Sequence, residues 1–421
     1  MAVLLGAIAD DFTGATDLSN TLISSGMHVI QTIGVPKKSV DISKADAVVV
    51  ALKSRTAPVD RAVSDSIAAL RWLRRLGVQQ FFFKYCSTFD STHEGNIGPV
   101  ADALLTELEE NFALVCPAFP ANSRTVYMGH LFIGHKLLSE TPMKDHPLTP
   151  MQDANLIRLM STQSNRRVGL VPYNVVTTGS EATEKAFESL RLEGISYGVT
   201  DALSNKHLAT IGAAARMHRL ITGGSAVAQG LAENFRHAGL LGPPQKPRLP
   251  EVAGTAAILA GSCSQTTRKQ IACWQQNQYP LLKLDVSRIA CGEADLEEIL
   301  AWAENHNDQP ILIYSSDDPA DVQAVQEQYG REQVSALIED TMGKIAIGLV
   351  GMGRRKLILA GGETAGAVVS ALGIDGLRIG PEIDPGVPWT ETIKKPRIAL
   401  ALKSGNFGSD DFFMKAFRML P

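Results

Sequence analysis

Short apolar runs alternate with amphipathic stretches along most of the chain, and this alternation predicts its secondary structure. In the first half, the runs that indicate buried strands are residues 3–9, 28–33, 46–52, 80–84, 113–117, 167–173 and 198–200. Helical spacing predicts helices over residues 60–76, with Gly77 as the C-cap residue, and over residues 208–220. Strands that alternate with helices are typical of a parallel, doubly wound sheet.

The second half of the chain repeats this pattern. Strands are predicted at residues 255–260, 310–314, 356–360 and 397–402, and helices at residues 270–276 and 367–372. The two halves meet at residues 242–250, where four prolines forbid a helix and favour an extended backbone. We therefore predict two doubly wound, largely parallel α/β domains, residues 1–242 and 251–421, joined by a proline-rich linker.

Residues 120–150 fit neither a long helix nor a single strand. They contain many turn residues together with Arg124, Tyr127, His130, His135, Lys136 and His146. Loops of this length in compact domains often act as lids or as binding loops. This segment is therefore a candidate for contact with a ligand.

Polar side chains follow the first predicted strand directly. Asp10, Asp11, Thr13 and Asp17 lie where a ligand binds in an open parallel sheet, beyond the carboxyl end of a strand. Two adjacent carboxylates repel each other, so they favour a cation, a ligand hydroxyl or a basic side chain between them. The alternative is structural: Thr13 or Asp11 caps the following helix, with Asp17 in its first turns.

A second polar group follows the strand at residues 80–84. It comprises Lys84, Ser87, Thr88, Asp90, Ser91 and Thr92, with Gly95 and Asn96 shortly after. So many donors and acceptors suit a polyhydroxylated substrate, although a solvated turn would look the same. Arg124 and Lys84 are candidates for binding a substrate carboxylate, the alternative being a surface salt bridge.

Glycine-rich loops follow three predicted strands of the second half, at residues 261–264, 361–366 and 404–405. Backbone amides in such loops, with a helix N-terminus behind them, bind phosphates. The chain has neither GxxxxGK[ST] nor a GxGxxG that opens a helix after a strand, which argues against a P-loop or dinucleotide site. Three such loops in one domain still favour a nucleotide.

Composition narrows the classes of function. Forty basic and forty-four acidic residues give a net charge of −4, and there is no long basic run, which argues against a nucleic-acid surface. No apolar segment reaches the roughly 18 residues of a membrane span. Five cysteines without CxxC spacing indicate reduced thiols. We expect a soluble, cytoplasmic protein that binds neither nucleic acid nor membrane.

Six motifs, in order, resemble the four-carbon acid sugar kinase family over residues 8–412. They are IADDFTGATD at residues 8–17, FKYCSTFDST-x-x-GNIGPV at 83–100, CPAFP-x-N-x-R at 116–124, AGSCS at 260–264, GGETAGAVV at 361–369 and ALKSGNFG at 401–408. The resemblance implies an N-terminal domain that binds a four-carbon sugar acid and a C-terminal domain that binds ATP. The two domains are expected to close on each other.

The resemblance also implies roles for individual residues. Asp10 or Asp11 is the expected base or positioning group for the substrate hydroxyl. The expected substrate-binding residues are Thr13, Asp17, Lys84, Ser91, Thr92, Asn96 and Arg124. The expected ATP-binding residues are Ser262, Ser264, Gly361, Gly362, Glu363, Thr364 and Gly405. Magnesium is expected with ATP, but the sequence assigns it no ligand. A homodimer is a further expectation.

Residues 91–96 read Ser-Thr-His-Glu-Gly-Asn, where threonate kinases carry an arginine two residues before the asparagine. This departure resembles the branch that phosphorylates the C4 hydroxyl of a 3-oxo-tetronate. A threonate or erythronate kinase is the alternative within the family. A haloacid-type phosphatase would need DxDx[TV] spacing, which is absent. A sugar-acid sensor would not need the glycine-rich loops of the second half.

Overall fold

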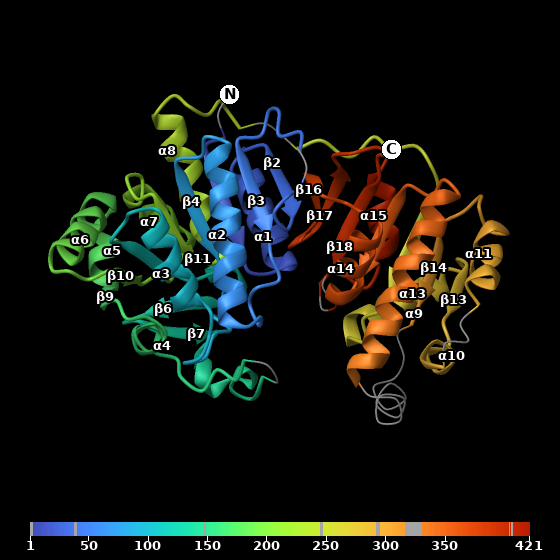
Figure 1. The fold of residues 1–421 in the computed structure, drawn as a ribbon, viewed down its shortest axis with the longest axis horizontal. Helices are drawn as coiled ribbons and strands as arrows, with labels where there is room; N and C mark the ends of the chain where they lie inside the picture. Colours follow the sequence, from blue (N-terminus) through green and yellow to red (C-terminus); the bar gives the residue numbers. More distant parts are fainter. Residues whose placement is uncertain are drawn as a thin grey trace. The chain divides into compact units, whose positions relative to one another are not determined.

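The computed structural model describes residues 3–37, 40–146, 149–244, 247–291, 295–315, 331–403, 405 and 407–421 (Figure 1). The chain divides into two compact units, Met1–Lys246 and Pro247–Pro421. Each unit is built on a largely parallel sheet with helices packed against it, which confirms the predicted α/β fold class.

The sheet of the first unit is parallel throughout, in the order β2-β3-β1-β4-β11-β5-β10-β9. Its strands are β1 (Leu5–Ala9), β2 (Val29–Ile33), β3 (Ala47–Ala51), β4 (Gln80–Lys84), β5 (Ala113–Cys116), β9 (Val168–Val171), β10 (Tyr197–Thr200) and β11 (Leu220–Gly223). Strands β1, β3, β4 and β5 are buried along their whole length, as their apolar runs predict. Because β1 lies between β3 and β4, the loops after these three strands share one edge of the sheet.

The helices of the first unit are α1 (Phe12–Ser24), α2 (Val59–Arg75), α3 (Ile97–Glu107), α4 (Leu156–Gln163), α5 (Tyr173–Thr178), α6 (Ser180–Leu192), α7 (Asn205–Ala214) and α8 (Leu231–His237). Helix α2 ends as predicted, with Gly77 at φ 84°. The helix predicted to reach residue 220 is wrong in its end: α7 stops at Ala214, and residues 220–223 form β11 between β4 and β5.

Residues 124–137, within the segment predicted as a lid or binding loop, form a separate antiparallel sheet. Its strands are β6 (Arg124–Tyr127), β7 (His130–Ile133) and β8 (Lys136–Leu137). One buried side chain fixes the β6–β7 turn: the carboxylate of Asp201 accepts from the backbone amides of Met128 at 2.7 Å and Gly129 at 2.9 Å. The segment is therefore held by the hydrogen bonds of its own sheet and by Asp201, which lies outside it.

The sheet of the second unit has the order β13-β14-β12-β15-β18-β17-β16. The first five strands are parallel: β12 (Ala256–Ala260), β13 (Leu281–Lys283), β14 (Ile311–Tyr314), β15 (Lys356–Ala360) and β18 (Ala399–Lys403). An antiparallel hairpin of β16 (Gly376–Asp384) and β17 (Val387–Thr392), which the pattern did not predict, extends it. The pattern missed this hairpin because Gly380, Pro381 and Pro388 interrupt its apolar run.

The helices described in the second unit are α9 (Gln265–Gln276), α10 (Val286–Ala290), α11 (Leu296–Glu304), α13 (Arg331–Gly351), α14 (Gly362–Ala371) and α15 (Phe412–Met419). Two helices begin earlier than predicted. Helix α9 starts at Gln265, capped by Ser264, and α14 starts at Gly362, so residues 362–366 are helix rather than loop. The turn from β15 into α14 is this short because Gly361 has φ 127°, which glycine alone adopts readily.

Arg354 ties the amino-terminal edge of this second sheet together. Its buried guanidinium donates to the carbonyls of Ala256 at 2.6 Å and Ala303 at 3.0 Å, and also to those of His306 and Gln309. Arg354→Met would leave several buried carbonyls without donors, so we expect the free energy of unfolding to fall by about 3 kcal/mol or more. Urea unfolding measures this change. Arg378→Met is the control, because Arg378 is half exposed and pairs with Glu391 only at 3.9 Å.

Candidate active site

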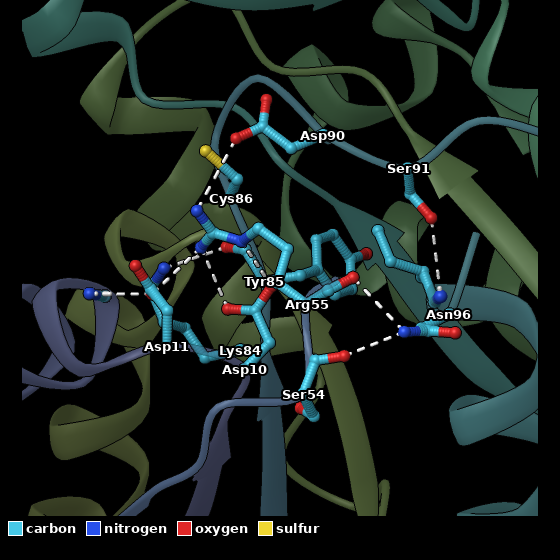
Figure 2. Close-up of polar contacts among 12 residues, drawn as sticks. Asp10, Asp11, Ser54, Arg55, Lys84, Tyr85, Cys86, Asp90, Ser91 and Asn96 are labelled. Carbon is cyan, nitrogen blue, oxygen red and sulfur yellow. Dashed lines mark hydrogen bonds and ion pairs between the residues drawn. The ribbon is translucent and has the colours of Figure 1, made fainter. Parts of the chain in front are cut away.

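Arg55 gathers the carboxylates at the edge of the first sheet (Figure 2). Its Nε lies 2.8 Å from Oδ2 of Asp10, and its Nη2 lies 3.0 Å from Oδ1 of Asp10 and 2.9 Å from Oδ1 of Asp11. Its Nη1 lies 3.5 Å from Oδ2 of Asp90. A basic side chain thus separates the adjacent aspartates, one of the arrangements expected for such a pair.

Asp11 also caps helix α1, so the structural alternative holds as well. Its Oδ1 accepts from the backbone amide of Gly14 at 2.9 Å. The Asp11 side chain is 29% exposed and that of Asp10 is 6% exposed, so Asp11 is the more accessible of the two. Burial raises the pKa of Asp11, the charge of Asp10 raises it further, and the cations Arg55 and Lys84 offset part of this rise.

The positive charge of Arg55 is stabilised by the neighbouring carboxylates of Asp10 and Asp11. Burial alone would lower the pKa of its guanidinium, but the charges of Asp10 and Asp11 outweigh burial and raise the pKa well above its usual value. The residue stays charged at every pH at which the protein is folded. It was not among the residues predicted from the sequence. The signal that could have found it is its position just after β3, the strand beside β1.

Lys84 and Asp17 lie on the α1 side of the cluster. The Lys84 side chain is buried, and its Nζ donates to the carbonyl of Tyr85 at 2.9 Å. A Cβ on Gly14 would lie 2.4 Å from this nitrogen, so glycine is what lets the lysine reach the first turn of α1. Asp17 accepts a hydrogen bond from Ser225, and burial raises its pKa, partly offset by Lys84. Thr13 lies half-buried in the same first turn.

The loop after β4 presents Asp90 in a strained backbone conformation. Phe89 and Asp90 have φ 65° and 48°, a left-handed region that costs free energy for residues other than glycine. The Thr88 hydroxyl donates to Oδ1 of Asp90 at 2.7 Å, which orients the carboxylate. Burial raises the pKa of the nearby Cys86 to about 11, so this residue remains a thiol near neutral pH.

Asn96 supports the loop that carries Arg55. Its Nδ2 donates to the carbonyls of Ser54 at 2.7 Å and Arg55 at 3.2 Å (Figure 2), and also to that of Ala57 at 2.8 Å. The amide nitrogen is thereby occupied by backbone. The direct substrate contact predicted for Asn96 stays a prediction, and the partners of its amide nitrogen come from a segment some forty residues earlier in the sequence.

Ser91 and Thr92 lie in a loop held by Gln163 of helix α4. Ser91 Oγ donates to Oε1 of Gln163 at 3.2 Å, and Nε2 of Gln163 donates to the carbonyls of both loop residues. Gln163 is a second residue that the sequence reasoning missed. Ser91 lines a small cavity together with Asp10, Arg55 and other side chains, with about the volume that one water molecule needs.

Arg124 belongs to the small antiparallel sheet rather than to the loops that carry these residues. It begins strand β6 of the small antiparallel sheet, where its guanidinium donates to the carbonyl of Asn122. The structure therefore brings Asp10, Asp11 and Asp90 into contact with Arg55, places Lys84 near Asp11 and Asp17, and lines one small cavity with Ser91, Asp10 and Arg55. Arg124 has a local partner instead.

The glycine-rich loops of the second unit follow the neighbouring strands β12, β15 and β18. Their backbones approach closely: a Cβ on Gly261 would lie 2.3 Å from Oγ1 of Thr364, and one on Gly405 would lie 2.3 Å from Oγ of Ser262. Ser264 Oγ caps α9 and donates to the carbonyl of Gly405 at 2.6 Å. These loops therefore form one continuous surface at the carboxyl edge of the sheet.

Helix α14 presents its N-terminus at this edge. Gly362 is its first residue, and a Cβ there would meet open space; Glu363 follows in an exposed position. Beneath the loops, the buried Lys403 donates from Nζ to Thr267 Oγ1 and to the carbonyls of Gly405 and Phe407, at 3.0–3.1 Å. Burial lowers its pKa to about 8. Ser404, part of the predicted loop, lies outside the described residues.

The residues that the structure describes contain neither a metal-binding cluster nor a membrane-spanning helix. No group of three or more His, Cys, Asp or Glu side chains there is arranged to hold a metal ion. None of the helices in the same ranges is long and apolar enough to cross a membrane.

Comparison with known proteins connects both sites to a family. Residues 5–231 match a family model described as a sugar-binding N-terminal domain, and residues 257–413 match a nucleotide-binding C-terminal domain. The chain is 51% identical to a 3-oxo-tetronate kinase of Cupriavidus necator, over 99% of this chain and 97% of the relative. The chain belongs to the four-carbon acid sugar kinase family. The resemblance stated from the motifs is thus confirmed.

Other members of the four-carbon acid sugar kinase family are similar over the same length. A 3-oxo-tetronate kinase of Burkholderia multivorans is 52% identical, over 99% of this chain and 97% of the relative. A crystal structure of a Haemophilus influenzae protein is 43% identical and superposes with a TM-score of 0.86, over 99% of this chain and 100% of that one. The similarity therefore includes both units.

Proposed function

We propose that the chain is an ATP-dependent 3-oxo-tetronate kinase, which transfers the γ-phosphate of ATP to the C4 hydroxyl of a 3-oxo-tetronate. The observation that carries this proposal is the identity of about one half, along nearly the whole chain, to curated kinases of that name. The family models add a sugar-binding and a nucleotide-binding part in the same order.

The sugar acid would bind at the carboxyl edge of the first sheet, beside Asp11. Phosphoryl transfer needs an aligned hydroxyl and an environment that neutralises charge, rather than covalent help from the protein. Asp11 is accessible and has a raised pKa, which suits a group that accepts the proton of the attacking hydroxyl. Asp10, held by two bonds to Arg55, would position rather than react.

ATP would bind at the carboxyl edge of the second sheet. The N-terminus of α14 offers backbone donors for phosphate oxygens, whereas the amides of Gly261 and Ser262 already donate to the carbonyl of Ala360 and that of Ser264 donates to Oγ of Ser262. The predicted contacts from Ser262, Ser264, Gly361 to Thr364 and Gly405 remain predictions. Magnesium reaches kinases largely coordinated by phosphate oxygens and water, so we propose that it arrives with ATP. A homodimer, a cytoplasmic location and the absence of nucleic-acid binding also remain predictions from the sequence.

The oxidation level of the substrate is the first thing to measure. We expect kcat/KM for 3-oxo-tetronate to exceed that for threonate or erythronate by at least about 100-fold, because a site matched to one set of donors and acceptors leaves the other unpaired. Glu94 stands where threonate kinases carry arginine, and it cannot donate when ionised.

A coupled ADP-release assay on a panel of four-carbon acids gives this ratio, and ³¹P NMR of the product locates the phosphate. Equal or reversed values of kcat/KM for the two kinds of acid would contradict the assignment of a 3-oxo substrate. The proposal that the chain is a kinase would still stand. A complete lack of ADP release with every acid, in a chain that binds the acids, would favour the sensor instead.

A further inference from the structure

We propose that Arg55 is a positioning residue of the phosphoryl-transfer site, which keeps Asp11 ionised and directed at the substrate hydroxyl, and that Asn96 acts through Arg55. The inference rests on the proposed kinase function and deepens it. Arg55 lies outside all six motifs that connect the chain to its family, and its role emerges only from the contacts it makes.

The guanidinium donors of Arg55 are directed mainly at Asp10. Asp10 receives two roughly parallel bonds, from Nε and Nη2, in the fork geometry that fixes an arginine most firmly. The remaining contacts reach Asp11 at 2.9 Å and Asp90 at 3.5 Å. Asp10 therefore anchors the guanidinium, and the anchored guanidinium fixes Asp11.

The contacts that hold Asp11 use one of its two carboxylate oxygens. Both Arg55 Nη2 and the backbone amide of Gly14 contact Oδ1. Among the described residues, Oδ2 is thus the oxygen left for a ligand. Two donors on one oxygen hold the carboxylate plane while the other oxygen faces a partner, which is the arrangement that a base requires.

Asp11 lies within a cluster of charged and titratable side chains. Each element packed around Asp11 contributes a charged or titratable group: Asp10 after β1, Arg55 after β3, Lys84 of β4, Cys86 and Asp90 after β4, and Asp17 of α1. Four carboxylates thus face two cations. Removing Arg55 would leave only Lys84 and the amide of Gly14 to oppose burial and Asp10, both of which raise the pKa of Asp11. The pKa of Asp11 would then rise further, so a smaller fraction of its carboxylate could accept the proton of the hydroxyl.

Arg55 is held in place from two sides, through its backbone and through its guanidinium. Asn96 fixes the backbone of residues 54–57 through three carbonyls, and Asp90 meets the guanidinium from a loop with two consecutive left-handed residues. Strained backbone and buried charge are both costly, and they persist together mainly where a site needs its groups held.

The test is Arg55→Ala in the full chain, with rates measured from pH 5 to pH 9. We expect kcat to fall by about 100-fold or more, as when a fixed electrostatic contact is lost. We also expect the acid limb of the kcat/KM profile to move up by about one pH unit or more, because an opposite charge beside Asp11 is gone. Added guanidinium should restore part of the rate.

Two variants keep the test decisive. Arg71→Ala is the matched control, because Arg71 makes a two-bond pair with Glu107 on an exposed surface and should leave rate and profile unchanged. If Arg55→Ala does not fold, Arg55→Lys replaces it: the charge remains, so the acid limb should stay in place while kcat falls, since a lysine cannot make the fork contacts.

Asn96→Ala tests the second half of the proposal. It should lower kcat with little change in KM. Arg55→Ala should lower kcat by a smaller factor in the Asn96→Ala variant than in the wild type, because the two residues act together. A folded Arg55→Ala variant that keeps the wild-type rate, or loses rate with an unmoved acid limb and no guanidinium rescue, would overturn the proposal. Absence of kinase activity in the wild type would instead overturn the proposed function.

Discussion

Asp11→Asn is expected to lower kcat by about 100-fold or more while the chain stays folded. Asparagine caps a helix as well as aspartate does, so α1 should keep its start. What the variant loses is a carboxylate that can take the proton of the substrate hydroxyl. Steady-state kinetics with 3-oxo-tetronate and ATP measure kcat, and thermal unfolding measures the fold.

Two further Asp→Asn substitutions make the result specific. Asp295→Asn is the matched control, because Asp295 caps α11 in the same way, with Oδ1 bonded to the amides of Glu297 and Glu298, and should change little. Asp10→Asn should lower both stability and rate, because it breaks the two-bond contact with Arg55. Wild-type turnover in the Asp11→Asn variant would remove Asp11 from the chemistry.

Gly362→Val is expected to weaken ATP binding by at least about 100-fold in the full chain. The residue begins α14, and its Cβ would point into open space, so the fold has room for the larger side chain. A phosphate group held by the amides at this helix N-terminus needs the same room. Isothermal calorimetry with ATP gives the affinity.

The control for this substitution is Gly351→Val at the end of helix α13. A Cβ there also meets open space, so any general effect of adding valine should appear in both variants. We expect Gly351→Val to bind ATP normally. Unchanged affinity in the Gly362→Val variant would place the nucleotide away from residues 361–364.

The sequence predicts well those features that depend on a single continuous segment. Strands β1, β3 and β4 are apolar throughout, so their positions and the polar loops after them follow from the pattern. Strand β11 was missed because its four residues come directly after the polar Arg219 and are too few to show a period.

The residues of the candidate site also fall into those that the sequence predicts and those that only the structure reveals. Asp10 and Asp11 stand out because they adjoin a strand, whereas Arg55 and Gln163 acquire meaning only from partners distant in sequence. An arginine after a strand is most often a solvated side chain. Only the folded chain shows that Asp10, Asp11 and Asp90 surround Arg55, and that Asn96 supports its backbone.

The three carbonyl contacts of Asn96 have a consequence for engineering substrate preference. The segment 91–96, where we expect threonate kinases to carry a different motif, is coupled through Asn96 to the backbone of residues 54–57. Replacing residues 91–96 alone with those of a threonate kinase would place a foreign loop against the unchanged backbone of residues 54–57. A productive chimera should exchange both segments together, as one structural module.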